Sequence, residues 1–248
     1  RTFMSIDSMN LCFENIVFSY TGVEKPALND VSVMFHPGER IALVGRNGGG
    51  KSTLMLIANG VLRPQSGNLF FNEHLIQYDR KNLLHLRQNV GIVFQNPEDQ
   101  LFSASVLQDI SLGPLNLGMS EVEARKRVME VADFCGLTDL LDRPTHALSG
   151  GEKTRAALAG VLAMKPLYLF ADEVTNSLDP WMRNQIMEIL DQWVMQGHTV
   201  VLSTHDWNLA GRWAQRIIWM EQGQIYKQGD ADHILYESEL AVGDNKNG

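Results

Sequence analysis

The chain has 248 residues, of which 44% are hydrophobic and 20% charged, the composition of a globular protein with enough length for a sizeable core. Its formal net charge of −8 argues against nucleic acid as the main partner, because phosphate backbones attract basic surfaces. No apolar stretch approaches the ~18–20 residues that span a bilayer, and no signal-peptide pattern opens the sequence.

The first part of the chain predicts two strands and then a third that leads into a loop. Leu11–Phe18 has the pattern of a strand, and a second strand is expected near Val31–Phe35. Arg40–Val44 is a short apolar run of the kind that forms a buried strand. A helix is expected to begin near Lys51, directly after a glycine-rich loop.

That loop predicts a nucleoside triphosphate site. It contains Gly45, Asn47, Gly48, Gly49, Gly50, Lys51, Ser52 and Thr53. Glycines allow the backbone to place several amides around an anion in front of a helix N-terminus. We expect Lys51 to reach the β- and γ-phosphates and the Ser52 hydroxyl to bind Mg²⁺. A glycine-rich turn without function is improbable, because the full GxxxxGKS pattern follows a strand.

Residues 95–165 have a different, mostly helical character. Ser120 and Glu123 form a capping-box pattern, after which apolar residues recur at helical spacing as far as Cys135. The alanine-rich stretch from Lys153 to Met164 predicts a buried helix. We therefore expect residues 95–165 to be a helical subdomain, inserted between residues 1–94 and 166–248, which form the nucleotide-binding core with its β subdomain.

Strands and helices alternate again in the last third of the chain. The expected elements are a strand at Leu167–Ala171, a helix at Trp181–Gln196, a strand at Thr199–Ser203, a hairpin of Ile217–Met220 and Ile225–Lys227, and a fraying tail from Ala231. Such alternation favours an α/β fold whose parallel sheet carries helices on both faces.

Two acidic residues follow the strand at Leu167–Ala171. Asp172 closes an apolar run, where a carboxylate is costly unless it faces a site at the carboxyl edge of the sheet. There it is expected to hold Mg²⁺, directly or through water. Glu173 is expected to take a proton from an attacking water or to orient it. A solvated pair at a strand end is the simpler alternative, but the phosphate loop in the same chain favours the catalytic interpretation.

A second cluster of backbone amides is expected at Leu148-Ser149-Gly150-Gly151-Glu152, where another helix starts. Such amides attract a phosphate. Because the chain's own loop already holds one, the sequence suggests a site that another subunit completes.

Together, five motifs resemble the nucleotide-binding subunit of an ATP-binding-cassette (ABC) transporter. They are the loop at 45–53, LSGGE at 148–152, FADE at 170–173, NSLD at 176–179 and STHD at 203–206. The resemblance spans about residues 11–230 and implies a P-loop NTPase core with an N-terminal antiparallel β subdomain. It also implies a head-to-tail dimer that holds two ATP molecules, each touching one chain's phosphate loop and the other chain's Ser149, Gly150 and Gly151.

The resemblance assigns roles to four further residues. Tyr20 matches the aromatic residue that stacks on adenine, and Gln95 matches the glutamine that senses Mg²⁺ and the γ-phosphate and links them to the membrane partner. His205 matches the γ-phosphate histidine; the remaining histidines are expected at the surface. Asp179 matches the aspartate that organises the dimer interface.

The sequence departs from the family at two notable positions. Val174 stands where the family usually has proline, which changes local backbone stiffness but removes no catalytic group. Glu152 replaces the commoner glutamine. Neither departure argues against ATP hydrolysis.

A narrower resemblance points to the energy-coupling-factor group, whose ATPases serve importers of vitamins and of cobalt or nickel ions. Val93–Phe102, Gly113–Gly118 and Arg143–Gly151 carry it. It implies a transmembrane coupling subunit, a substrate-capturing membrane subunit, a homodimer or a heterodimer with a second cassette, and a place on the cytoplasmic face of the membrane. Two alternatives remain open: a soluble cassette ATPase that acts on DNA or ribosomes, and a binding-only partner in an asymmetric pair.

Overall fold

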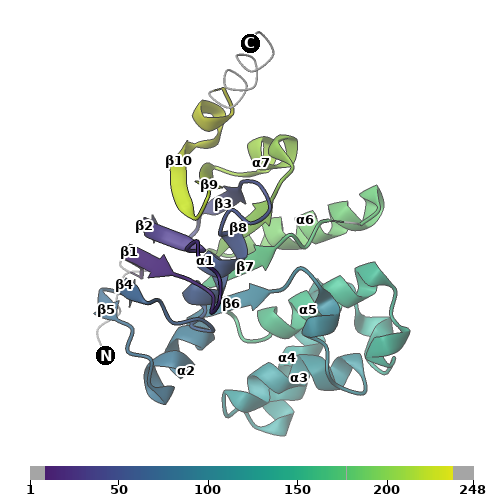
Figure 1. Ribbon diagram of the computed structural model, residues 1–248. Coiled ribbons are helices and arrows are strands. Elements are labelled where there is room, and N and C mark those ends of the chain that lie inside the picture. Colours follow the sequence, from purple (N-terminus) through teal and green to yellow (C-terminus); the bar gives the residue numbers. More distant parts are fainter. Residues whose placement is uncertain (1–8, 177, 237–248) are drawn as a thin grey trace.

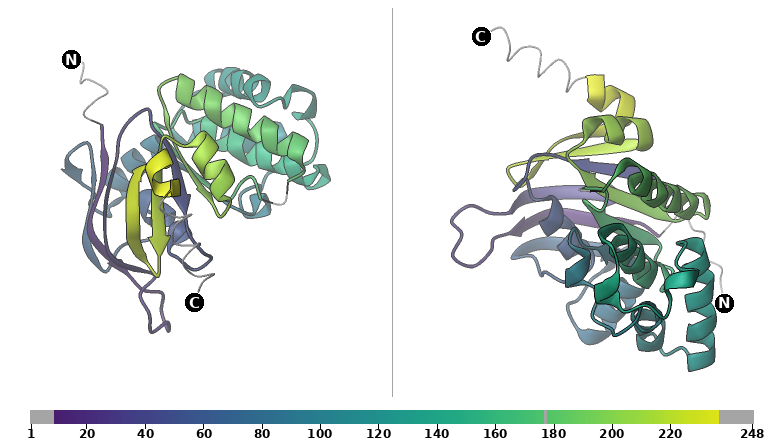
Figure 2. Two further views of the ribbon diagram at one scale, coloured as in Figure 1. Left: turned by 90° about the horizontal axis from the view of Figure 1, so that it is seen from above. Right: turned by 90° about the vertical axis from the view of Figure 1, so that its right-hand side faces the viewer.

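Two β-sheets and a group of helices make up residues 9–176 and 178–236, the part of the chain that the computed structural model describes (Figures 1 and 2). Ser177, within the motif at 176–179, and the tail beyond residue 236, which was expected to fray, lie outside these residues. Residues 231–236 are helical. Among the described residues, no helix combines the length and the apolar character needed to cross a bilayer.

The smaller sheet is antiparallel and is built from the N-terminal part of the chain. Its strands are β1 (Leu11–Phe18), β2 (Leu28–Phe35), β4 (Ser66–Phe71) and β5 (His74–Leu75), in the order β2-β1-β4-β5. Apolar residues alternate along β1 and β2, so that one face of this sheet is buried. The expected antiparallel β subdomain is confirmed.

The larger sheet carries the site. Its strands are β3 (Arg40–Val44), β6 (Val90–Val93), β7 (Tyr168–Asp172), β8 (Thr199–Thr204), β9 (Arg216–Glu221) and β10 (Gln224–Asp230), in the order β10-β9-β3-β8-β7-β6. All neighbouring pairs are parallel except β10 with β9, which form the expected antiparallel hairpin. The carboxyl ends of β3, β7 and β8 are neighbours, so loops that follow them meet at one edge.

Successive residues of β7 face two different cores. Leu169 and Ala171 pack on the side that also holds apolar residues of helices α3 to α7. Tyr168 and Phe170 pack on the opposite side, together with α1, α2 and the smaller sheet. The Tyr168 hydroxyl lies 2.8 Å from the carbonyl oxygen of Met9 and 3.0 Å from that of Phe35, which ties β7 to the smaller sheet.

The helices cover the larger sheet and extend beyond it. They are α1 (Lys51–Ala58), α2 (Arg80–Asn89), α3 (Val106–Asn116), α4 (Glu121–Phe134), α5 (Gly150–Leu162), α6 (Pro180–Met195) and α7 (Trp207–Trp213). Helices α3, α4 and α5 contact one another and form a group to one side of β6 (Figure 1). Residues 95–165 are therefore mostly helical, as predicted.

Most predicted elements are confirmed, with boundary shifts of one to three residues. The helix expected from Lys153 already begins at Gly150, because Ser149 caps it. The sequence patterns did not indicate β4, β5, α2, β6 or α7. The expectation that every histidine other than His205 lies at the surface is wrong for His198, which is half-buried and stacks on Trp193 with ring centroids 4.0 Å apart.

Candidate functional site

The glycine loop joins β3 to α1 and depends on glycine at particular points. Gly45 has φ +147°, and a Cβ there would lie 2.1 Å from the carbonyl oxygen of Met220 in β9. Gly50 has φ +102° and precedes the first residue of α1. A side chain at either position would move the backbone. The loop thus keeps its amides and the N-terminus of α1 open to an anion.

Lys51 supplies the positive charge of the loop. Its side chain is buried, and its ammonium group donates to the carbonyl oxygens of Gly45 at 2.9 Å and Arg46 at 3.3 Å. The same nitrogen lies 3.7 Å from Oε1 of Glu173. The predicted phosphate-binding lysine and the predicted base, which are distant in the sequence, therefore meet at one site.

Asp172 is the last residue of β7 and Glu173 follows it; both are buried. The Ser203 hydroxyl at the end of β8 donates to Oδ1 of Asp172 and accepts from the backbone N–H of Glu173 at 3.0 Å. Glu173 has φ +48°, in the left-handed region, which turns its side chain away from the course of the strand. Ser203, which the sequence analysis did not assign, thus holds the carboxylate of Asp172 and the backbone of Glu173.

Two side-chain amides contact the Glu173 carboxylate. Gln95 donates to its Oε2 at 3.2 Å, and Asn176 donates to the same oxygen at 2.6 Å. The Asn176 amide nitrogen is also 3.4 Å from Nδ1 of His205. The structure thereby brings together Lys51, Gln95, Glu173 and His205. Asn176 lay within a recognised motif but received no role from the sequence.

Tyr20 lies at the entrance to the phosphate loop. Its ring is 42% exposed and meets Phe18 edge-on, with centroids 5.0 Å apart. Its hydroxyl lies 3.2 Å from the hydroxyl of Thr53 in α1. The Tyr20 ring is thus fixed beside the loop and accessible, as a ring that stacks on a nucleobase must be.

The signature segment begins α5 with a complete capping box. The backbone N–H of Ser149 donates to Oε2 of Glu152 at 2.7 Å, and the N–H of Glu152 donates to the Ser149 hydroxyl oxygen at 3.4 Å. The backbone N–H and the side chain of Ser149, together with Arg143 at 3.3 Å, hold the pKa of Glu152 below its usual range. Glu152 therefore caps the helix as an anion, and the first amides of α5 remain free for an external acceptor.

Asp179 lies at the start of α6, where its side chain accepts from the N–H of Met182 at 2.9 Å. It therefore caps a helix in this chain. Its predicted part in a dimer interface remains a proposal.

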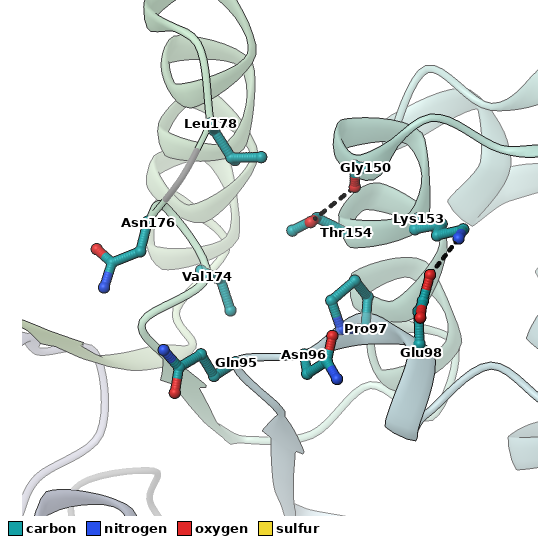
Figure 3. A pocket seen from close by; sticks show the side chains of 10 residues that line it. All are labelled: Gln95, Asn96, Pro97, Glu98, Gly150, Lys153, Thr154, Val174, Asn176 and Leu178. Carbon is teal, nitrogen blue, oxygen red and sulfur yellow. Dashed lines mark hydrogen bonds and ion pairs between the residues drawn. The ribbon is translucent and has the colours of Figure 1, made fainter.

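A hollow of about 510 Å³ separates the signature helix from the catalytic residues (Figure 3). Gly150, Lys153 and Thr154 of α5 line one side, while Gln95 and Asn176 line the other. An ion pair between Lys153 and Glu98 joins α5 to the segment that follows Gln95. The start of the signature helix and the side chains of Gln95 and Asn176 thus lie on opposite sides of the hollow.

The donor set suits ATP and Mg²⁺. Ser52 is exposed in the first turn of α1, and Asp172 lies at the carboxyl edge of β7; hydroxyl and carboxylate oxygens are the ligands that Mg²⁺ prefers. Within the described ranges, no group of three or more His, Cys, Asp or Glu side chains could hold a metal alone.

Known proteins share this architecture. The ABC transporter family matches residues 28–176. The energy-coupling factor transporter ATP-binding protein EcfA of Methanosphaera stadtmanae is 42% identical over 228 residues, which are 92% of this chain and 81% of that protein. Other curated relatives are longer, and the chain spans 54% and 47% of two of them.

Solved structures agree with these matches. CbiO1 from Clostridium perfringens, part of the ABC transporter complex cbiONQ, has a TM-score of 0.82 and 39% identity, covering 95% of this chain and 94% of that one. A dimeric ATP-binding cassette in a post-hydrolysis state, bound to ADP and Pi, has a TM-score of 0.80 and 29% identity, covering 89% of this chain and 98% of that one.

Fold, site and relatives together define an ATPase of the ABC transporter class. The chain belongs to the ABC transporter family, within its group of energy-coupling factor ATP-binding subunits.

Proposed function

We propose that this chain is the ATP-hydrolysing motor of an energy-coupling-factor-type importer for a vitamin or a cobalt or nickel ion. It works as a head-to-tail dimer, with itself or with a second cassette, on the cytoplasmic face of the membrane. The observation that carries the proposal is the single site in which the Glu173 carboxylate lies 3.7 Å from the Lys51 ammonium group and accepts from Gln95. A base and a phosphate-binding cation in contact are what phosphoryl transfer to water requires.

Each residue of the site has a separate role in ATP hydrolysis. Lys51 exchanges its bonds to the loop carbonyls for bonds to the β- and γ-phosphates, and the loop amides hold the remaining oxygens. Glu173 accepts a proton from water as the water oxygen bonds to the γ-phosphorus and the bond to the ADP oxygen breaks. His205 donates to a γ-phosphate oxygen. Ser52, Asp172 and Gln95 would hold Mg²⁺, which would supply positive charge to neutralise the phosphates.

The dimer follows from the free amides of the signature helix. Gly150, at the start of the signature helix, lines the hollow, while the chain's own phosphate loop is built around Lys51 on a different element. We infer that Ser149, Gly150 and Gly151 bind the ATP held by the partner's loop, so that ATP closes the dimer and hydrolysis opens it. Each site is then composed of two half-sites.

Residues 95–165 form the arm that meets the membrane subunits, and residues 1–94 and 166–248 form the nucleotide core. Within the arm, Phe102 is 76% exposed, an unusual position for a large apolar side chain. Its backbone is held by Asp109, whose Oδ1 accepts from the N–H groups of Phe102 at 2.9 Å and Ser103 at 2.8 Å. A fixed, exposed phenylalanine close to Gln95 suits a docking contact for the coupling subunit.

Glu173→Gln tests the proposed chemistry. The amide cannot accept the proton, so turnover should fall by roughly 10²–10⁴-fold. ATP binding should persist, because Lys51 and the loop are intact, and ATP should now hold the chain as a dimer on size exclusion. Glu188→Gln, on the exposed side of α6, is the matched control and should hydrolyse at the normal rate. Normal turnover in Glu173→Gln would remove Glu173 from the reaction.

Phe102→Ser tests the docking contact. We expect it to weaken co-purification with the coupling subunit while the ATPase rate of the isolated chain stays unchanged, because Phe102 lies outside the site. Met129→Ser, also at an exposed apolar residue but on α4, is the control. Equal recovery of the complex with both variants would place the docking contact elsewhere.

A further inference from the structure

Asn176 occupies a position between two groups of the site. It lies in the turn after β7, where its backbone N–H donates to the carbonyl oxygen of Glu173 at 2.9 Å. This turn folds the side-chain amide back over the site, 2.6 Å from Oε2 of Glu173 and 3.4 Å from Nδ1 of His205. In Figure 3 the same side chain lies on the wall of the hollow opposite Gly150.

The chemistry of the neighbours decides which end of the amide faces them. The Glu173 carboxylate accepts only, so the NH₂ group of Asn176 must point toward it. The same nitrogen lies nearest to His205, and a nitrogen that carries two hydrogens meets Nδ1 as a donor. Nδ1 must then be the unprotonated nitrogen of a neutral imidazole, and the proton lies on Nε2.

We propose that Asn176 is a positioning residue that sets the tautomer of His205. By donating to Nδ1, it leaves the Nε2–H free to donate to the γ-phosphate, and by donating to Glu173 it keeps the carboxylate beside the histidine. This rests on the proposed function, since it deepens the roles given there to Glu173 and His205. Asn176 acts through these two residues and neither gives nor takes a proton itself.

Other charged groups at the site do not replace Asn176 in this role. Lys51 of α1 faces Oε1 of Glu173, on the carboxylate oxygen that Asn176 does not contact, and Asp172 is bound by Ser203. Within the described part of the chain, the only recorded side-chain partner of the His205 ring is Asn176. The tautomer is therefore set by one removable group.

Two substitutions of Asn176 test whether it sets the tautomer of His205. Asn176→Asp replaces the donor by an acceptor, so Nδ1 of His205 should carry the proton. Asn176→Ala removes the partner, so both tautomers should be populated. The direct measurement is the ¹⁵N chemical shift of the two ring nitrogens of His205 in nucleotide-free, histidine-labelled protein, assigned by comparison with His205→Ala.

In wild type we expect the shifts of an Nε2–H tautomer, in Asn176→Asp those of the opposite tautomer, and in Asn176→Ala intermediate values. The kcat of Asn176→Asp should fall by roughly 10- to 100-fold, while the KM for ATP changes little. Asn184→Asp, which adds the same charge on the exposed surface of α6, should alter neither.

Unchanged His205 shifts in both Asn176 variants would overturn the proposal, as would altered shifts without a loss of kcat. The ¹⁵N shifts of His205 are measured without nucleotide, so they do not depend on whether Glu173→Gln lowers turnover. If that variant keeps normal turnover, the proposed chemistry fails while the tautomer assignment is still decided by the spectra.

Discussion

A mixture of two inactive variants gives the sharpest test of a shared site. Lys51→Ala removes the ammonium group of one half-site, and Ser149→Arg blocks the donors of the other. In the structure the Ser149 hydroxyl belongs to the capping box with Glu152, at the start of the signature helix. Each variant alone inactivates both sites of a homodimer, since every site needs one Lys51 and one Ser149.

In an equimolar mixture that pairs at random, about half of the dimers contain one chain of each kind. Such a heterodimer has one site with both defects and one site with none. About a quarter of all sites are then intact, and the mixture should recover about a quarter of the wild-type rate if the sites turn over independently. Phosphate release by the mixture, compared with each variant alone, measures this recovery.

A second readout covers the case in which turnover needs both sites. With Glu173→Gln added to each variant, ATP should produce dimers in the mixture but not in either variant alone, as seen by light scattering. A mixture that gains neither activity nor ATP-dependent dimers would show that Lys51 and Ser149 do not serve one composite site.

Two further predictions concern stability. Tyr168→Phe should lower the free energy of unfolding by about 1–2 kcal/mol, or Tm by roughly 2–8 °C, because it removes the hydroxyl that contacts the carbonyl oxygens of Met9 and Phe35; thermal unfolding of the Phe variant at full wild-type Tm would contradict this. Burial holds the pKa of His198 below its usual range. The contribution of the neutral His198 side chain to stability is therefore complete above the ordinary histidine pKa, and it is lost as the pH falls through the lower pKa of the folded state. Tm should therefore drop more steeply between about pH 7 and pH 5 in wild type than in His198→Gln, and parallel curves would argue otherwise.

The sequence predicted those strands and helices whose own residues follow a recognisable apolar pattern. The strand at Leu11–Phe18 is rich in apolar residues, and the strand before Gly45 is apolar after Arg40, so each carried a local signal. The short strands β4 and β5 and the largely polar helix α2 have no such pattern. The place of β4 in its sheet depends on pairing with β1, which is distant in the sequence. The capping box of Ser149 and Glu152 did have a local signal, the S-x-x-E spacing, that could have found it.

The sequence alone determined which residues bring chemistry to this protein. A glycine loop with Lys51, a carboxylate pair at a strand end and an LSGGE helix start are each legible within a few residues, because each needs particular residue types at fixed spacing.

The tertiary structure decided how those residues act on one another. Gln95 and Glu173 are 78 positions apart and Asn176 and His205 are 29 apart, yet each pair lies within hydrogen-bond distance. The parallel order of β3, β8 and β7 brings their loops to one edge, and the left-handed turn at Glu173 aims its carboxylate at Lys51. Contacts of this kind arise from strand order and backbone turns, which no local spacing records.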